Sequence, residues 1–92
     1  MVTTIAQHKV KDYANWKQVY DSQVALRTSS GMLSDHIYRD ASDPNNIAVI
    51  INWNSLETAQ KFFHSPELKA AMEKSGVLGQ ANFSFLNDVN VN

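Results

Sequence analysis

The sequence predicts an α+β fold of the ferredoxin-like βαββαβ kind, in which a four-stranded antiparallel sheet carries its helices on one face. Three observations point to this class: four segments have the composition of strands, two have apolar residues at helical spacing, and turn or cap signals separate them. Short connections and right-handed crossovers then favour a single sheet. We expect residues 1–92 to form one domain.

The first half of the chain predicts a strand followed by a long helix. Residues 2–10 are rich in β-branched side chains and form the expected first strand. Asp12 is the expected N-cap of a helix that runs to about Ser29, where a Ser-Ser-Gly sequence ends it. Apolar residues at helical spacing form a stripe typical of a helix lying on a sheet: Tyr13, Trp16, Val19, Tyr20, Val24 and Leu26.

A β-hairpin is predicted in the middle of the chain. Residues 32–40 form its first strand and residues 47–53 its second. The sequence Asp-Pro-Asn-Asn at 43–46 is a turn signal, because aspartate accepts a local hydrogen bond and proline fixes φ. The strand over residues 47–53 is the most apolar one, so we expect it at the centre of the sheet.

Two consecutive helical segments are predicted after this hairpin. Ser55 is the expected cap of a helix over residues 56–64. The sequence Ser-Pro-Glu at 65–67 then starts a second segment, with serine as the cap and proline at the first helical position. This segment runs to about Ser75, and Gly76 ends it.

The last predicted strand, residues 81–89, completes a sheet whose second face has no cover. Phe83 and Phe85 alternate along this strand. The face away from the helices combines apolar and polar residues, namely Ile5, Gln7, Ala48, Ile50 and Asn52. A 92-residue chain without cysteine builds a modest core and has no disulfide to support it. We therefore expect a homodimer in which a second sheet covers this face.

Composition and charge exclude several classes of protein. Eight basic and nine acidic residues are balanced, which argues against a nucleic-acid-binding surface. The sequence contains no apolar stretch of the about 20 residues that a membrane span needs. The start, MVTTIAQHK, lacks the pattern of a signal peptide, so we expect a cytoplasmic protein that binds neither nucleic acid nor membrane.

Several short motifs resemble a known superfamily. These are YANWK, IYRD-x-x-DPN, the strand ending in NW, and SLE-x-A-x-x-F-x-x-SPELKAAM-x-x-x-GV. Together they resemble the dimeric α/β-barrel superfamily, and in particular small proteins of the antibiotic biosynthesis monooxygenase type, from Thr3 to about Val89. The resemblance implies two sheets packed into a barrel at the dimer interface, and a ligand cavity between each sheet and its own helices. The superfamily includes oxygenases, haem degraders, polyketide cyclases, isomerases and proteins without an assigned reaction.

Two branches of the superfamily can be tested by residue. The haem-degrading branch needs a tryptophan and, ten residues later, a histidine ligand, and those places hold Phe62 and Met72. The plant polyketide-cyclase branch needs a tyrosine and a histidine, where this chain has Phe62 and Leu68. We therefore expect no haem and no other cofactor.

Three histidines are present without metal-ligand spacing, so we expect no metal site. His64 closes a helix and His36 lies on an edge strand, where we expect it to be exposed. His8 lies on the first strand and shares a face with the small residues Thr4 and Ala6. By the resemblance this face lines the cavity, so His8 is the candidate general base. The alternative is a structural histidine bonded to a carbonyl.

An aromatic pocket is predicted beside His8. Its substrate-binding residues are Trp16, Tyr20, Trp53, Phe62 and Met72. The alternative is that these side chains simply fill the core, although ligand cavities are themselves mostly apolar. Arg27 could hold a ligand carboxylate or phenolate, or extend to solvent. Asp35 and Arg39 are expected to pair on the edge strand.

The leading functional hypothesis is a small monooxygenase-like enzyme that oxygenates a planar aromatic or polyketide-like molecule without a cofactor. His8 would be the base, and Tyr20 and Trp53 would position the ring. One alternative is a small-molecule-binding or stress-related barrel protein without turnover. Another is a polyketide cyclase or isomerase that works by proton transfer alone.

Overall fold

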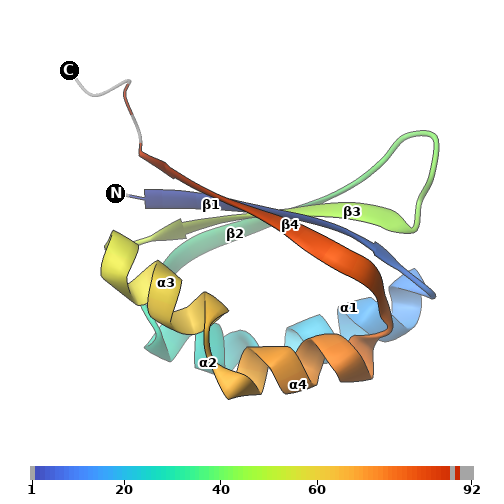
Figure 1. Ribbon diagram of the computed structural model, residues 1–92, viewed down its shortest axis with the longest axis horizontal. Coiled ribbons are helices and arrows are strands. Elements are labelled where there is room, and N and C mark those ends of the chain that lie inside the picture. Colours follow the sequence, from blue (N-terminus) through green and yellow to red (C-terminus); the bar gives the residue numbers. More distant parts are fainter. Residues whose placement is uncertain (1, 88, 90–92) are drawn as a thin grey trace.

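A computed structural model, which describes residues 2–87 and 89, shows one four-stranded sheet lying over a layer of helices (Figure 1). The elements follow in the order β1 (Val2–Val10), α1 (Tyr13–Ser22), α2 (Val24–Ser29), β2 (Met32–Arg39), β3 (Asn46–Trp53), α3 (Leu56–Phe63), α4 (Pro66–Ser75) and β4 (Val77–Asn87). This is the α+β, ferredoxin-like arrangement that the sequence predicts, with the helices on one face.

The sheet has the strand order β2-β3-β1-β4, and all neighbouring strands are antiparallel. The two central strands are therefore β3 and β1, and β2 lies at an edge as expected. Every second residue of a strand points to the helices, and in β1 these are the buried ones. Ala6 pairs with Val49 of β3 and with Phe83 of β4, so the three side chains share the helix-covered face.

Local side-chain hydrogen bonds explain where the helices begin. The Asp12 carboxylate accepts from the backbone N–H of Ala14, and Ser55 Oγ accepts from that of Thr58. Ser65 Oγ accepts from the N–H of Leu68, with proline at the first helical position of α4. All three caps are the ones that the sequence predicts.

The predicted helix from residue 13 to residue 29 is wrong in one respect, because it breaks at Gln23. This residue has φ −101° and ψ 10°, outside the helical region. Just before it, the Ser22 hydroxyl donates to the Val19 carbonyl at 2.6 Å, and such a bond competes with the helical ladder. The break turns the next segment, so Val24 leaves the apolar stripe and is 50% exposed, while Arg27 is buried.

The last strand also differs from prediction, since it begins at Val77 rather than Ala81 and ends at Asn87. Gly76 adopts the left-handed conformation (φ 80°) that ends α4 and directs the chain straight into β4. A bulge then shifts the pairing of β4 with β1, and Gly79 (φ 69°) supplies the positive φ within it. Val89 follows the strand and is exposed, and Asp88 lies outside the described residues.

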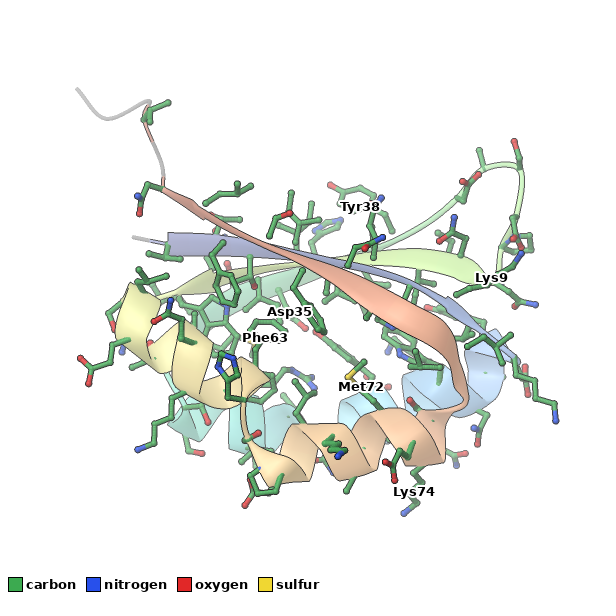
Figure 2. The ribbon with its side chains drawn as sticks, viewed as in Figure 1. Lys9, Asp35, Tyr38, Phe63, Met72 and Lys74 are labelled. Atoms are coloured by element: carbon green, nitrogen blue, oxygen red, sulfur yellow. The ribbon has the colours of Figure 1, made fainter. Side chains whose placement is uncertain are left out.

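The sheet face away from the helices is uncovered in the single chain. Ile5 pairs with Ile50 across β1 and β3 on this face, and both are only partly buried. Figure 2 shows Tyr38 on the same side, pointing away from the helices, and its ring stacks on the exposed His36. Within residues 2–87 and 89, no helix has the length and apolar character needed to cross a membrane.

Candidate functional site

A cavity of about 70 Å³ lies between the sheet and the helices. Four predicted aromatic or histidine residues line it, namely His8, Trp16, Tyr20 and Phe62, together with Met72. Figure 2 shows Met72 pointing from α4 toward the sheet, and Phe63 on the same inner side of the helical layer. The remaining wall is mainly apolar and includes Ala6, Val49, Ile51, Leu68 and Phe83.

His8 is a buried histidine whose ring makes no hydrogen bond. The residue is 9% exposed, and neither Nδ1 nor Nε2 has a partner. Burial lowers the pKa of His8 from its ordinary value of 6.5, because the charged imidazolium would lose its hydration. The alternative of a structural histidine bonded to a carbonyl is therefore wrong. The ring is neutral at pH 7, and both nitrogens are available to a ligand.

The strands explain the position of His8. The alternation of β1 places it on the helix-covered face, opposite Ile47 of β3. On its other side the pairing with β4 jumps from Gln7–Asn82 to Lys9–Leu78. The bulge in β4 thus interrupts the regular sheet beside His8, and bulges of this kind often occur next to functional sites.

An aromatic shelf extends from His8 along α1. The His8 and Trp16 ring centroids are 5.7 Å apart, and the Trp16 and Tyr20 rings stack at 4.9 Å with an angle of 23°. Because Trp16 and Tyr20 are one helical turn apart, their side chains lie on the same side of α1, where the two rings meet face to face. The shelf therefore presents the apolar edges of two stacked rings to the cavity, and a planar ligand can lie along these edges.

A polar cluster closes the end of the shelf beyond Tyr20. The Tyr20 hydroxyl donates to the Asp35 carboxylate at 2.6 Å. The guanidinium carbon of Arg27 lies 3.6 Å from the centre of the Tyr20 ring, and its Nη1 donates to the Tyr20 carbonyl at 2.7 Å. Burial, and then the bond to Asp35, raise the pKa of Tyr20 far above its ordinary value, so the phenol stays protonated.

Two expectations about charged residues are corrected here. Arg27 does not extend to solvent but is 3% exposed, with its guanidinium stacked on the ring of Tyr20. Asp35 and Arg39 do not pair. Asp35 faces Tyr20, whereas Arg39 stacks on the ring of Tyr13 at 3.8 Å and its Nε donates to the Pro44 carbonyl at 2.8 Å.

Trp53 does not line the cavity. It is 0% exposed, and its indole N–H donates to the Thr4 hydroxyl at 2.8 Å. Its ring packs against Phe62 and Phe63 at centroid distances of 5.1 and 5.9 Å. Trp53 therefore supports the wall from behind and cannot position a ring by contact in this arrangement.

Phe63 and Phe83 also line the cavity and are not among the residues that the sequence predicts for it. Their rings approach to 4.9 Å, which joins α3 to β4. A signal for Phe83 exists in the pattern, since it alternates with Phe85 and pairs with the small residue Ala6. For Phe63 the local signal is its helical spacing with Leu56 and Ala59, which predicts a shared face of α3 but not a place in the cavity wall.

A second, larger hollow of about 530 Å³ adjoins α4 and β4. Three residues, Phe63, Leu68 and Met72, line both this groove and the inner cavity. Its other walls include Lys69, Gly79 and His64, whose Nδ1 lies 2.8 Å from the Gln60 carbonyl at the end of α3. The shared residues form the partition between groove and cavity.

Among the residues that the structure describes, no three histidine, aspartate or glutamate side chains are grouped closely enough to hold a metal ion. The ionisable groups at the cavity are thus His8, Tyr20 and Arg27, with Asp35 behind them. The arrangement combines an apolar space, a neutral base and a buried cation.

The model of the antibiotic biosynthesis monooxygenase family matches residues 1–74. Among solved structures, a protein from Bordetella bronchiseptica assigned to these monooxygenases is similar, with a TM-score of 0.81 and 13% identity over 96% of each chain. SnoaB, a cofactor-independent oxygenase from Streptomyces nogalater, has a TM-score of 0.80 and 13% identity over 98% of this chain and 94% of its own.

A third similar structure, from Caulobacter crescentus, has a TM-score of 0.78 and 18% identity over 97% of this chain and 90% of its own. At these identities the structures show a shared fold. A comparison with curated proteins found no match. Since the family model covers most of the sequence, the chain belongs to the antibiotic biosynthesis monooxygenase family.

Proposed function

We propose that this protein is a cofactor-independent monooxygenase that oxidises a small planar aromatic or polyketide-like molecule. The observation that carries the proposal is His8, a neutral histidine with two unpartnered ring nitrogens in the wall of an apolar cavity. Buried polar groups almost always have partners, so such a residue suggests a role in ligand chemistry. The family assignment and the name of the oxygenase SnoaB support the same reaction class.

The proposed reaction starts when a ring nitrogen of His8 removes a proton from an activated CH₂ group of the substrate. The resulting carbanion is delocalised onto a ring oxygen and transfers an electron to O₂. The two radicals combine into a peroxide anion, which takes the proton back from His8 and becomes a hydroperoxide. Loss of the remaining C–H proton then breaks the O–O bond, and this proton and the released hydroxide leave as water. The CH₂ group becomes a carbonyl, and O₂ supplies one atom to the carbonyl and one to water.

The protein contributes a base, an aromatic surface and a space from which water is excluded. The shelf of Trp16 and Tyr20 aligns the substrate ring, and the apolar wall strengthens electrostatic interactions inside. The substrate itself supplies the electrons, so no step requires a bound redox group.

The size of the cavity sets a condition on how substrate binds. Typical ligand pockets measure about 300–1,000 Å³, whereas the inner cavity measures about 70 Å³. We therefore propose that substrate enters from the groove of about 530 Å³ by displacing the partition, above all Met72. Methionine is flexible and adapts readily to a different neighbour.

We propose further that the working form is a homodimer, supported by the uncovered apolar pair Ile5 and Ile50. A chain without cysteine does not need an oxidising compartment, and we propose a cytoplasmic location.

Oxygen uptake with anthrone as the probe tests the proposal. The expected result is consumption of O₂ and formation of anthraquinone in equal amounts, at a rate that depends on His8. Binding of anthrone without oxygen uptake would instead support a protein without turnover. A third outcome would indicate an isomerase or cyclase that uses His8 for proton transfer. In that case the CH₂ protons of anthrone would exchange for deuterium without oxygen, and no oxygen would be consumed when it is present.

A further inference from the structure

Two arginines of this chain stack on tyrosines in almost the same way. Arg27 lies 3.6 Å from the centre of the Tyr20 ring, and Arg39 lies 3.8 Å from that of Tyr13. The pairs differ in their remaining hydrogen bonds. The exposed Arg39 uses its Nε–H to bind the Pro44 carbonyl, whereas the Nε–H of Arg27 is buried and has no partner.

The charge of Arg27 is only partly compensated. Nη1 donates to the backbone carbonyl of Tyr20, which is a neutral acceptor. Nη2 lies 4.0 Å from Asp35 Oδ2, beyond hydrogen-bonding distance, and this oxygen already accepts from the Tyr20 hydroxyl. A buried cation is unfavourable unless it is paired and hydrogen-bonded, and Arg27 is 3% exposed. Since it also lines the cavity, the missing partner can come from a ligand.

The geometry points to Arg27 as the residue that selects a ligand with an acidic oxygen, such as a phenol, an enol or the enolate of a ring ketone. We infer that this oxygen binds the Arg27 guanidinium while the rest of the ring lies along Trp16 and Tyr20 toward His8. The contacts follow this order, with His8 next to Trp16, Trp16 next to Tyr20, and Tyr20 next to Arg27.

The arrangement narrows the substrate class of the proposed reaction, on which this part of the inference rests. If His8 removes a proton at one end of the ring, the negative charge that stabilises the anion should develop on an oxygen conjugated with that carbon, at the end near Arg27. A cation there stabilises the charge as it forms. The expected substrate is therefore an aromatic ketone or phenol whose oxygen is conjugated across the ring with the reacting carbon.

Binding of para-nitrophenol tests the inference without any turnover. Its anion has a visible absorption that the neutral form lacks, so a pH titration of the complex gives the pKa of the bound phenol. In the wild-type protein we expect this pKa to be at least about one unit lower than in the Arg27→Met variant, because a cation at short range favours the anion. The wild type should also prefer para-nitrophenol to nitrobenzene, which has the same ring without the hydroxyl.

Three further variants make the test specific. Arg27→Lys keeps the positive charge and should retain part of the shift, even if Arg27→Met folds poorly. Asp35→Asn removes the competing carboxylate and should lower the bound pKa further. Arg39→Met removes the matched arginine outside the cavity and should change nothing. Either of two results overturns the inference. The first is a wild-type protein that shows no preference for para-nitrophenol over nitrobenzene. The second is a bound pKa that stays unchanged in Arg27→Met, or in both of the single variants Arg27→Lys and Asp35→Asn.

The inference and the proposed function fail in different ways. If Arg27→Met loses the preference for the anion but oxidises anthrone at the wild-type rate, Arg27 binds acidic oxygens without helping the reaction. The role in charge stabilisation is then wrong. If the wild type shows the preference but consumes no oxygen with anthrone, the oxygenase proposal is wrong and the acidic-oxygen site remains.

Discussion

The ring of His8 lies 5.7 Å from the ring of Trp16 and is inclined to it by 56°, and neither of its nitrogens has a hydrogen-bond partner. The contact packs the imidazole against Trp16 without engaging either ring nitrogen. Because this aromatic contact involves no hydrogen bond, both imidazole nitrogens remain able to exchange a proton with a ligand. This combination distinguishes His8 from His64, which is exposed and has a backbone carbonyl at one ring nitrogen.

Replacing His8 should remove the proposed base. We expect His8→Ala to lower oxygen uptake with anthrone by about 10²–10⁴-fold, the usual contribution of a general base. The control is Lys74→Ala, since Lys74 is exposed on α4 and points away from the sheet (Figure 2), so its loss should not affect the rate per folded protein. Equal loss in both variants would indicate a general effect on folding, and full activity in His8→Ala would remove His8 from the mechanism.

The pH dependence of the reaction follows from the same burial. Only the neutral form of His8 accepts a proton, and its pKa is lowered from 6.5. At low substrate concentration, the protonation of His8 should therefore not limit the rate at pH 7 and above. The rate should fall only at a pH below 6.5. A pH profile of kcat/KM measures this, and an acid-side pKa above 6.5 would contradict the lowered pKa of His8 in the free protein.

Stability should change with pH in the same range. Below pH 6.5 the unfolded chain binds a proton at His8 that the folded chain resists, so the free energy of unfolding falls as the pH is lowered. His8→Gln removes this contribution. We expect the variant to lose less stability than the wild type between pH 6.5 and the lowered pKa, as measured by denaturant unfolding. Parallel pH curves for the two proteins would contradict the assigned pKa direction.

Met72 should control access to the cavity. It lines both the groove and the inner cavity, so a larger, rigid side chain there should obstruct the passage. We expect Met72→Trp to raise KM for anthrone strongly and Met72→Ala to leave substrate binding intact. Lys74→Ala is a suitable control, because Lys74 is exposed on the same helix and Figure 2 shows it pointing away from the sheet. Unchanged kinetics in Met72→Trp would place the passage elsewhere.

The hydrogen bond between Trp53 and Thr4 should contribute stability and have little effect on ligand binding. Trp53→Phe leaves the buried Thr4 hydroxyl without its donor, and we expect a loss of about 1–3 kcal/mol in the free energy of unfolding. Part of this cost should be absent when Thr4→Val is made in the Trp53→Phe background, since both polar partners are then gone. A double-mutant cycle by chemical denaturation measures the difference, and simple additivity would argue against the bond.

Dimerisation can be tested through the Ile5–Ile50 pair. Light scattering at micromolar concentration should give about twice the 10.3 kDa chain mass. Ile50→Glu places a charge in the middle of the uncovered face, and we expect it to yield monomers with an intact fold. A wild-type protein that is monomeric under these conditions would contradict the proposed barrel.

The sequence alone determined the features that depend on short-range patterns. The alternation of residues 2–10 places His8 on the face that also carries Thr4 and Ala6, because successive side chains of a strand point to opposite sides. The caps at Ser55 and Ser65 and the end of α4 at Gly76 are equally local, since each depends on hydrogen bonds or backbone angles within a few residues.

Only the tertiary structure decided which of the predicted residues meet. Trp53 satisfies its indole N–H on Thr4, 49 residues away, and this long-range bond holds it in the wall behind the cavity. Arg27 follows Tyr20 by seven residues, a spacing that puts both on one helical face, but only the folded chain shows that its guanidinium stacks on Tyr20 near Asp35 of β2 and does not reach solvent. Both outcomes depend on contacts between distant segments, which compete with local preference and are absent from any short window of sequence.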